Sequence, residues 1–178
     1  QFAETFGMRE TYGTERLGNY LLVYLSPDDL ETHLLAQLSE ERIAWLARTL
    51  ADNRNVPTII FFHAPLAGTL TPYNERVNAP SFIAQPADRL GELLRANPQV
   101  FLWVAGHMHV PATNADYNSP VNVYEKRVTV IHNADLERKR PWTNVLYLYP
   151  EKVLVRTYEH WQKTWLHDLE RTIRPPGR

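Results

Sequence analysis

Three short runs of apolar residues stand out along the chain, at residues 20–25, 58–62 and 100–105. The second and third runs show no alternation of apolar and polar positions, which is the pattern of strands covered on both faces. Segments with apolar residues at helical spacing separate the runs. The order strand, helix, strand, helix, strand predicts a layered α/β structure.

Each helical segment has its own boundary signals. Ser39 is a good N-cap for the first helix, and the two glutamates after it suit the positive end of the helix dipole. Apolar residues recur from Ile43 at the i, i+3, i+4 and i+7 positions of one buried face. We expect this helix to end near residues 52–55, ahead of Pro57, and a second helix to occupy residues 86–97.

The two ends of the chain have a different texture. Residues up to Gly18 are polar and are predicted to be irregular. Near the other end, residues 128–131, 145–149 and 153–158 are predicted to form antiparallel strands, the last two as a hairpin. We expect residues 161–169 to form either a short helix or an extended arm.

Composition places the chain among ordinary globular proteins and narrows its partners. It has 178 residues, of which 44% are hydrophobic and 22% charged, and its formal net charge is -1. This length fits one domain, and the charge gives no reason to expect nucleic acid as a partner. No apolar run has the length of a membrane span, so we expect no membrane partner. The chain has no cysteine, which excludes disulfides, thiolate metal sites and cysteine nucleophiles.

Histidines stand where two of the predicted strands end. His63 follows the second apolar run, and a His-x-His pair, His107 and His109, follows the third. Open α/β sheets place ligands at the carboxyl ends of strands, and neutral imidazole is a common ligand of zinc, iron and manganese-class ions. We expect Gly106 to provide the sharp turn that brings the imidazoles together. One histidine at a strand end is more often structural, but two such ends predict a metal site.

The sequences around these histidines resemble two motifs of the calcineurin-like metallophosphoesterases. Phe61-Phe62-His63-Ala64-Pro65 is similar to the family's fourth motif, a buried strand that ends in His-x-Pro. Gly106-His107-Met108-His109 is similar to the fifth motif, Gly-His-x-His. A Trp-Leu pair in the helix before the fourth motif, here Trp45-Leu46, also fits. The resemblance covers residues 20–110 and implies an α/β fold that is part of a metallophosphoesterase-type β-sandwich flanked by helices.

The resemblance also implies a chemistry. In the family, the residues matching His63 and His107 would ligate one ion of a two-metal centre, and the residue matching His109 would ligate the other. The cofactors would be two divalent ions, manganese, iron or zinc. The reaction would be hydrolysis of a small phosphomonoester or phosphodiester, because a two-metal centre clamps phosphate oxygens and activates water.

The chain departs from the family in one large respect. The family's first three motifs, Asp-x-His, Gly-Asp-x-x-Asp and Gly-Asn-His-Asp/Glu, have no counterpart here, and they carry the bridging aspartate and the histidine that assists the leaving group. We therefore expect a single partial domain, the C-terminal portion of an enzyme whose N-terminal half is missing, and note that the sequence begins at Gln1. Residues 1–110 would be the metal-ligand-bearing part and residues 111–178 the C-terminal strands and arm. We assign no catalytic residue and expect the chain alone to be inactive and to bind metal weakly.

Other interpretations stay open at this point. A non-catalytic domain that keeps the fold without a complete metal site is the main alternative. A cupin-type mononuclear site ranks low, because residues 110–115 lack the glutamate that such a site requires. His132 could line the site, but its apolar setting favours a structural role.

A missing half would have a consequence for association. The three apolar runs would expose strand edges and a bare core face, which invite pairing with another chain. We therefore expect a homo-oligomer formed through exposed strands.

Overall fold

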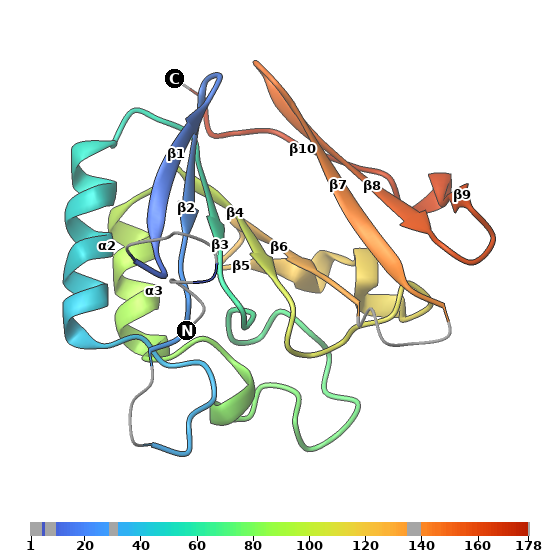
Figure 1. Ribbon diagram of the computed structural model, residues 1–178, viewed down its shortest axis with the longest axis horizontal. Helices are drawn as coiled ribbons and strands as arrows, with labels where there is room; N and C mark the ends of the chain where they lie inside the picture. Colours follow the sequence, from blue (N-terminus) through green and yellow to red (C-terminus); the bar gives the residue numbers. More distant parts are fainter. Residues whose placement is uncertain (1–4, 6–9, 29–31, 135–139, 178) are drawn as a thin grey trace.

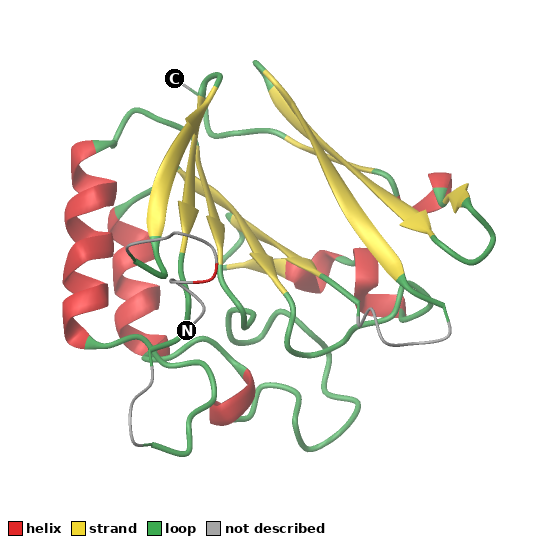
Figure 2. Cartoon of the chain, in the orientation of Figure 1, coloured by secondary structure: helices red, strands yellow, loops and turns green. Residues whose placement is uncertain are grey.

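The computed structural model describes residue 5 and residues 10–28, 32–134 and 140–177. Within these residues the chain has a mixed α/β fold, with two β-sheets and the helices α2 (Glu40–Asp52) and α3 (Ala87–Ala96) (Figures 1 and 2). No helix in this part of the chain is long and apolar enough to span a membrane.

The first sheet contains the three predicted apolar runs. Its spatial order is β1 (Gly13–Leu17), β2 (Tyr20–Tyr24), β3 (Thr58–Phe61), β4 (Val100–Ala105), β6 (Val128–His132) and β5 (Val123–Tyr124). The four central strands are parallel, and β1 and β5 pair antiparallel at the two edges. Parallel strands end at the same edge of a sheet, so the ends of β3, β4 and β6 lie together.

The second sheet is antiparallel. It contains β7 (Trp142–Tyr149), β8 (Lys152–Glu159), β10 (Arg171–Ile173) and the short β9 (Thr164–Trp165). The predicted hairpin is confirmed, with β7 and β8 paired from Trp142↔Glu159 to Tyr149↔Lys152. Short 3-10 helices connect the strands: η1 (Pro80–Phe82), η2 (Ala115–Asn118), η3 (Pro120–Asn122) and η4 (His167–Leu169).

Local sequence explains the first helix. The Ser39 hydroxyl accepts a hydrogen bond from the Arg42 backbone N–H at 3.2 Å, which confirms the N-cap and satisfies one of the free donors of the first turn. Ile43, Leu46 and Leu50 are its buried residues. The predicted spacing therefore sets both the start of α2 and the face that it turns to the core.

Two apolar layers enclose the first sheet. The layer beneath the helices includes Val23, Leu46, Ile60, Leu94 and Trp103. The layer between the two sheets includes Leu22, Ile59, Leu102, Val153 and Val155. Successive strand residues point to opposite faces, so the continuous apolar runs serve both layers. Burial of each such side chain stabilises the fold by about 1.5–3 kcal/mol.

The prediction for the N-terminal region was wrong. Residues 13–17 form β1, which joins β2 through a tight turn where Gly18 has a φ of 57°. Glycine adopts this left-handed conformation without a steric cost. The polar sequence that suggested an irregular segment belongs to an edge strand, where Glu15 and Arg16 face solvent.

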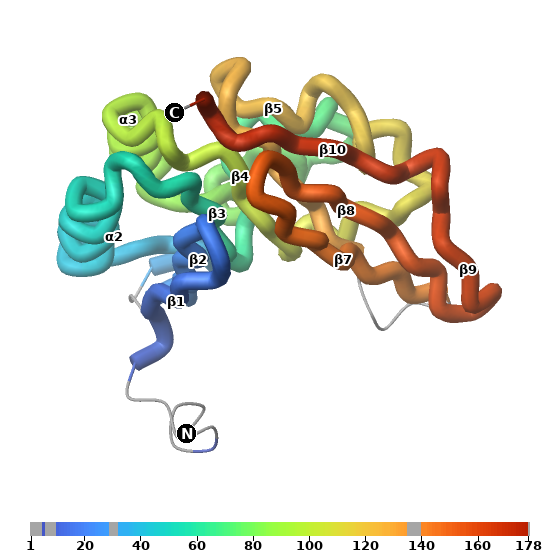
Figure 3. Tube along the Cα trace, turned by 90° about the horizontal axis from the view of Figure 1, so that it is seen from above, coloured from blue at the N-terminus to red at the C-terminus, as the bar shows by residue number. Residues whose placement is uncertain are grey.

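Two predictions for the C-terminal region also need correction. The strand at 128–131 was expected in an antiparallel set, but β6 pairs parallel with β4 and belongs to the first sheet. Residues 161–169 are neither one helix nor an extended arm. A turn leads into β9, only residues 167–169 form a short 3-10 helix, η4, and β10 then pairs with β8. Seen from above, the chain returns after β10 toward the first sheet (Figure 3).

The expected bare core face is absent within the described residues. Helices cover one face of β2, β3 and β4, and the second sheet covers the other. The edge of β2 is also occupied, by β1. Association through exposed strands stays a prediction, but these three strands do not supply the open surface on which it was based.

Candidate metal centre

His63 and His107 occupy equivalent places at the carboxyl edge of the first sheet. Each lies two residues beyond the end of its strand, β3 or β4. Backbone pairing continues past the strand ends, because the Phe62 N–H donates to the Val104 carbonyl at 3.1 Å and the Gly106 N–H donates to the His63 carbonyl at 2.9 Å. The sheet therefore fixes the two histidine backbones relative to each other.

The two imidazole rings meet. Their centroids are 4.6 Å apart, with an angle of 57° between the ring planes. The structure thus brings together two of the three histidines that the sequence singles out. At this separation both rings can offer a nitrogen to one small ion.

At this edge, the residues with a positive φ are histidines, and the nearby Gly106 is not one of them. His107 and His109 have φ angles of 61° and 50°, in the left-handed region. For residues with a Cβ this conformation costs about 1 kcal/mol or more each. The expectation that Gly106 makes the turn was wrong, since it does not have a positive φ and a Cβ there would meet only the His63 carbonyl, at 3.8 Å. Strained non-glycine residues gather at functional sites.

Helix η1 orients the His107 ring through two contacts. The His107 Nε2 lies 3.1 Å from the Ser81 carbonyl oxygen, and the Phe82 ring stacks on the imidazole at 5.3 Å with an interplanar angle of 24°. A carbonyl oxygen only accepts hydrogen bonds, so Nε2 carries the proton. The neutral ring then keeps its lone pair on Nδ1, and a metal-binding histidine is typically held by its other nitrogen in this way.

Electrostatics favour the neutral, metal-binding form of His63. Although its side chain is exposed at the surface, partial burial of the ring lowers its pKa, and the charges that His107 and His109 would carry lower it further. A lowered pKa keeps the lone pair of the His63 imidazole available. His109 is therefore within electrostatic reach of His63, and its own side chain is exposed.

The described residues do not complete a metal site. Across residues 10–28, 32–134 and 140–177, no three histidine, aspartate or glutamate side chains converge so that they could hold one ion. The donor chemistry at His63 and His107 fits a divalent transition metal. The number of donors falls short, because stable zinc sites use at least three protein ligands.

His132 ends the next parallel strand but is part of the core. Its side chain is fully buried, and its Nε2 lies 3.1 Å from the Thr69 carbonyl. Burial lowers the pKa of His132 to about 4, and nearby Arg171 adds to the effect. The His132 Nδ1 has no hydrogen-bond partner among the described residues. These surroundings are those of a structural histidine.

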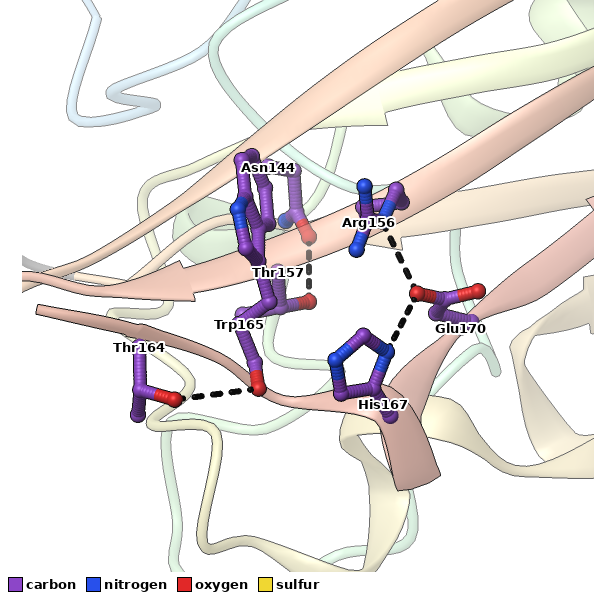
Figure 4. A network of polar contacts seen from close by, with 7 residues as sticks. All are labelled: Asn144, Arg156, Thr157, Thr164, Trp165, His167 and Glu170. Carbon is purple, nitrogen blue, oxygen red and sulfur yellow. Dashed lines mark hydrogen bonds and ion pairs between the residues drawn. The ribbon is translucent and has the colours of Figure 1, made fainter.

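Of the other histidines, His33 lies beside η1, where its backbone carbonyl accepts a hydrogen bond from the Ser81 hydroxyl at 3.1 Å. His160 Nε2 is 2.9 Å from the Thr143 hydroxyl on the second sheet. Figure 4 shows His167 and Arg156 converging on Glu170, whose Oε1 is 2.9 Å from His167 Nδ1 and 2.8 Å from Arg156 Nε. These contacts tie the segment before β10 to β8 and have no part in the candidate metal centre.

A pocket of about 610 Å³ lies at the other end of the sheet. Pro57 and Pro98, which line it, precede β3 and β4, and Pro176 and Gly177 of the C-terminal segment also line it. It is therefore at the amino ends of the strands that carry His63 and His107 at their carboxyl ends, and it is not part of the candidate site.

Comparison with known proteins supports the fold. No protein-family model and no curated protein sequence matches the chain. Among solved structures, a dimetal phosphatase from Danio rerio is similar, with a TM-score of 0.59 and 16% sequence identity over 89% of this chain. The match spans 58% of the phosphatase chain. At this identity the likeness shows the fold alone.

Sequence reasoning missed Ser81 and Phe82. They lie in the connection between the two histidine motifs, and nothing in their local pattern shows that this connection returns to His107. Pro80 marks the start of η1, but a proline in a loop is too common to identify a contact with the site.

Proposed function

We propose that this chain is the C-terminal part of a metal-dependent phosphoesterase and supplies one side of its two-metal site. His63 and His107 would bind one ion, and His109 would bind the other. The contact between the His63 and His107 rings at the ends of adjacent parallel strands carries the proposal. The similar fold of a dimetal phosphatase supports it.

The orientation of the His107 ring indicates which of its nitrogens would bind the metal. Because the Ser81 carbonyl holds Nε2–H, Nδ1 would be the ligating atom. His63 would be neutral near physiological pH, since its pKa is lowered. When bound, two divalent ions such as manganese, iron or zinc would clamp phosphate oxygens and activate water. The three histidines would bind and orient those ions.

The bridging carboxylate and the leaving-group acid would come from polypeptide other than these 178 residues. The substrate would be a small phosphomonoester or phosphodiester. The chain alone should show little hydrolysis of a generic aryl phosphate, because one side of a two-metal site cannot perform the displacement. Metal-dependent hydrolysis that His107→Ala abolishes would show instead that the chain is complete.

Titration calorimetry with Mn²⁺ and Zn²⁺ tests the proposal on the chain itself. We expect weak binding, micromolar or weaker, that His107→Ala reduces at least tenfold, since two nitrogen donors to one ion fall short of a full ligand set. His33→Ala is the matched control, because His33 is exposed and contributes only its backbone carbonyl, to Ser81. Equal affinities for the wild type and both variants would contradict the proposal.

A non-catalytic domain that keeps the fold is the alternative. The reading frame upstream of Gln1 distinguishes the two. Asp-x-His and Gly-Asp-x-x-Asp sequences there would supply the missing ligands and support the enzyme. Their absence would leave the histidines without the carboxylates that a two-metal site requires and would favour the alternative.

A further inference from the structure

A cation lies next to the candidate metal centre, on the loop that joins the two histidine motifs. The Arg76 guanidinium carbon is 5.6 Å from the centroid of the Phe82 ring, and the same ring stacks on His107. Phe82 therefore contacts both the cation and the candidate ligand. Cation–π contacts of this kind orient an arginine without neutralising it.

Arg76 has no ion-pair partner among the residues that the structure describes, although the exposed Glu75 is its neighbour in sequence. Some exposed arginines have such partners, for example Arg95 with Glu125 at 2.6 Å, whereas the exposed Arg48 and Arg54 have none among the described residues. An exposed guanidinium without a carboxylate partner can accept an anion bidentately.

The loop backbone around Arg76 is held in place. The Arg76 N–H donates to the Asn74 side chain at 2.9 Å, and the Arg76 carbonyl accepts from the Ala79 N–H at 3.0 Å. Asn78 fixes the loop further, because its side chain accepts from the Gly68 N–H at 2.8 Å and donates to the Leu70 carbonyl at 3.2 Å. Such preorganisation reduces the entropy lost on binding.

We propose that Arg76, set by Phe82, forms an anion-binding subsite of the substrate site. Its ligand is a second anionic group of the substrate, beyond the phosphate that the metals hold. The position favours a second group, because the Phe82 ring stacks on His107 and the Arg76 guanidinium carbon lies 5.6 Å from the centroid of the same ring. This inference rests on the proposed phosphoesterase function and narrows its substrates to phosphate esters with a further negative charge.

Inorganic pyrophosphate, titrated into the metal-free chain, tests the subsite without the metals. NMR of the arginine side-chain Nε–H signals should show a saturable shift at Arg76, and inorganic phosphate should bind more weakly. Arg76→Gln should weaken pyrophosphate binding about tenfold, as expected for a charge-assisted hydrogen bond. Phe82→Leu, which keeps the cation but removes its platform, should weaken it about threefold. Arg48→Gln, at an exposed position on α2, should leave it unchanged.

Each result is decisive. An Arg76→Gln chain that binds pyrophosphate as tightly as the wild type, or a wild-type chain with no shift at Arg76, overturns the subsite. Arg76 is exposed and Phe82 is partly exposed, and unchanged urea unfolding would confirm that the Arg76→Gln and Phe82→Leu chains fold. Failure of the metal titration with a retained Arg76-dependent shift would refute the phosphoesterase and leave an anion site. Metal binding without an Arg76-dependent shift would support the phosphoesterase and refute the anion subsite.

Discussion

His107 and His132 make the same hydrogen bond in two different settings. Each follows or ends a parallel strand of the first sheet, and each has its Nε2 3.1 Å from a backbone carbonyl. In its neutral form, each ring therefore keeps its lone pair on Nδ1. The difference is access: His107 is partly exposed beside the His63 ring, whereas His132 is fully buried.

The comparison shows which features make a histidine with a hydrogen-bonded Nε2 a candidate metal ligand. The His132 Nδ1 is enclosed near Arg171, and its charged form is strongly disfavoured. The His107 Nδ1 belongs to a ring that contacts the His63 imidazole. The backbone of His107 itself is in the strained left-handed conformation. The hydrogen bond selects the nitrogen, and solvent access with a second donor gives that nitrogen a possible function.

The largest expected effect is on stability when His132 is truncated. His132→Ala removes a fully buried side chain and one of the two donors to the Thr69 carbonyl, which also accepts from the Asn122 side chain at 3.0 Å. We expect a loss of about 3 kcal/mol in the free energy of unfolding, measured by urea denaturation. His107→Ala should cost less than half of that. Similar losses of unfolding free energy in the two variants would contradict the difference in burial between His132 and His107.

The second effect is a pH dependence that separates the same two histidines. Burial, with Arg171, lowers the folded pKa of His132 from 6.5 to about 4, although the hydrogen bond that His132 donates to the Thr69 carbonyl and the Asp116 charge raise it. The unfolded chain thus binds more protons between these values, so stability is full above pH 6.5 and falls as the pH drops toward 4. We expect a loss of about 2 kcal/mol between pH 7 and pH 5.

His132→Ala is the control for this pH dependence and should flatten most of it. A smaller slope of the same sign should persist, because the pKa of His63 is also lowered. Urea unfolding across the pH range checks both chains. If the free energy of unfolding of the wild type did not change with pH, the pKa of His132 would not be lowered by folding. If its pH dependence were the same in His132→Ala, another group would be responsible for it.

A smaller effect tests the backbone strain at the carboxyl edge of the first sheet. At His107, where φ is 61°, glycine should be more stable than alanine by about 1 kcal/mol, because a Cβ is penalised in the left-handed region. The adjacent Met108 does not have a positive φ, so there alanine should be the more stable residue. If alanine were better at both positions, the strain assigned to His107 would be absent.

The parts of the fold that sequence predicted well are those with a strong local pattern. β4 matches its predicted range, and β2 and β3 each end one residue before theirs. α2 also begins after Ser39 as predicted. In each case an apolar run or a capped amphipathic segment has only one favourable environment, so the local pattern is sufficient.

The missed parts depend on distant partners. β1 is a polar strand that exists because β2 offers it an edge, and the parallel pairing of β6 is set by the neighbouring β4. The same reason hid part of the site. His63 and His107 could be placed from strand ends, but the contacts of Ser81 and Phe82 depend on where a long loop returns.

Line broadening by Mn²⁺ tests the central claim most directly. Substoichiometric Mn²⁺ is added to the chain, and the ring signals of its seven histidines are followed by NMR. The account predicts that His63, His107 and His109 broaden first and together, and that His107→Ala removes the effect at His63. Broadening centred on the second sheet, at His160 or His167, or spread evenly over all exposed histidines, would contradict a metal site at the carboxyl edge of the first sheet.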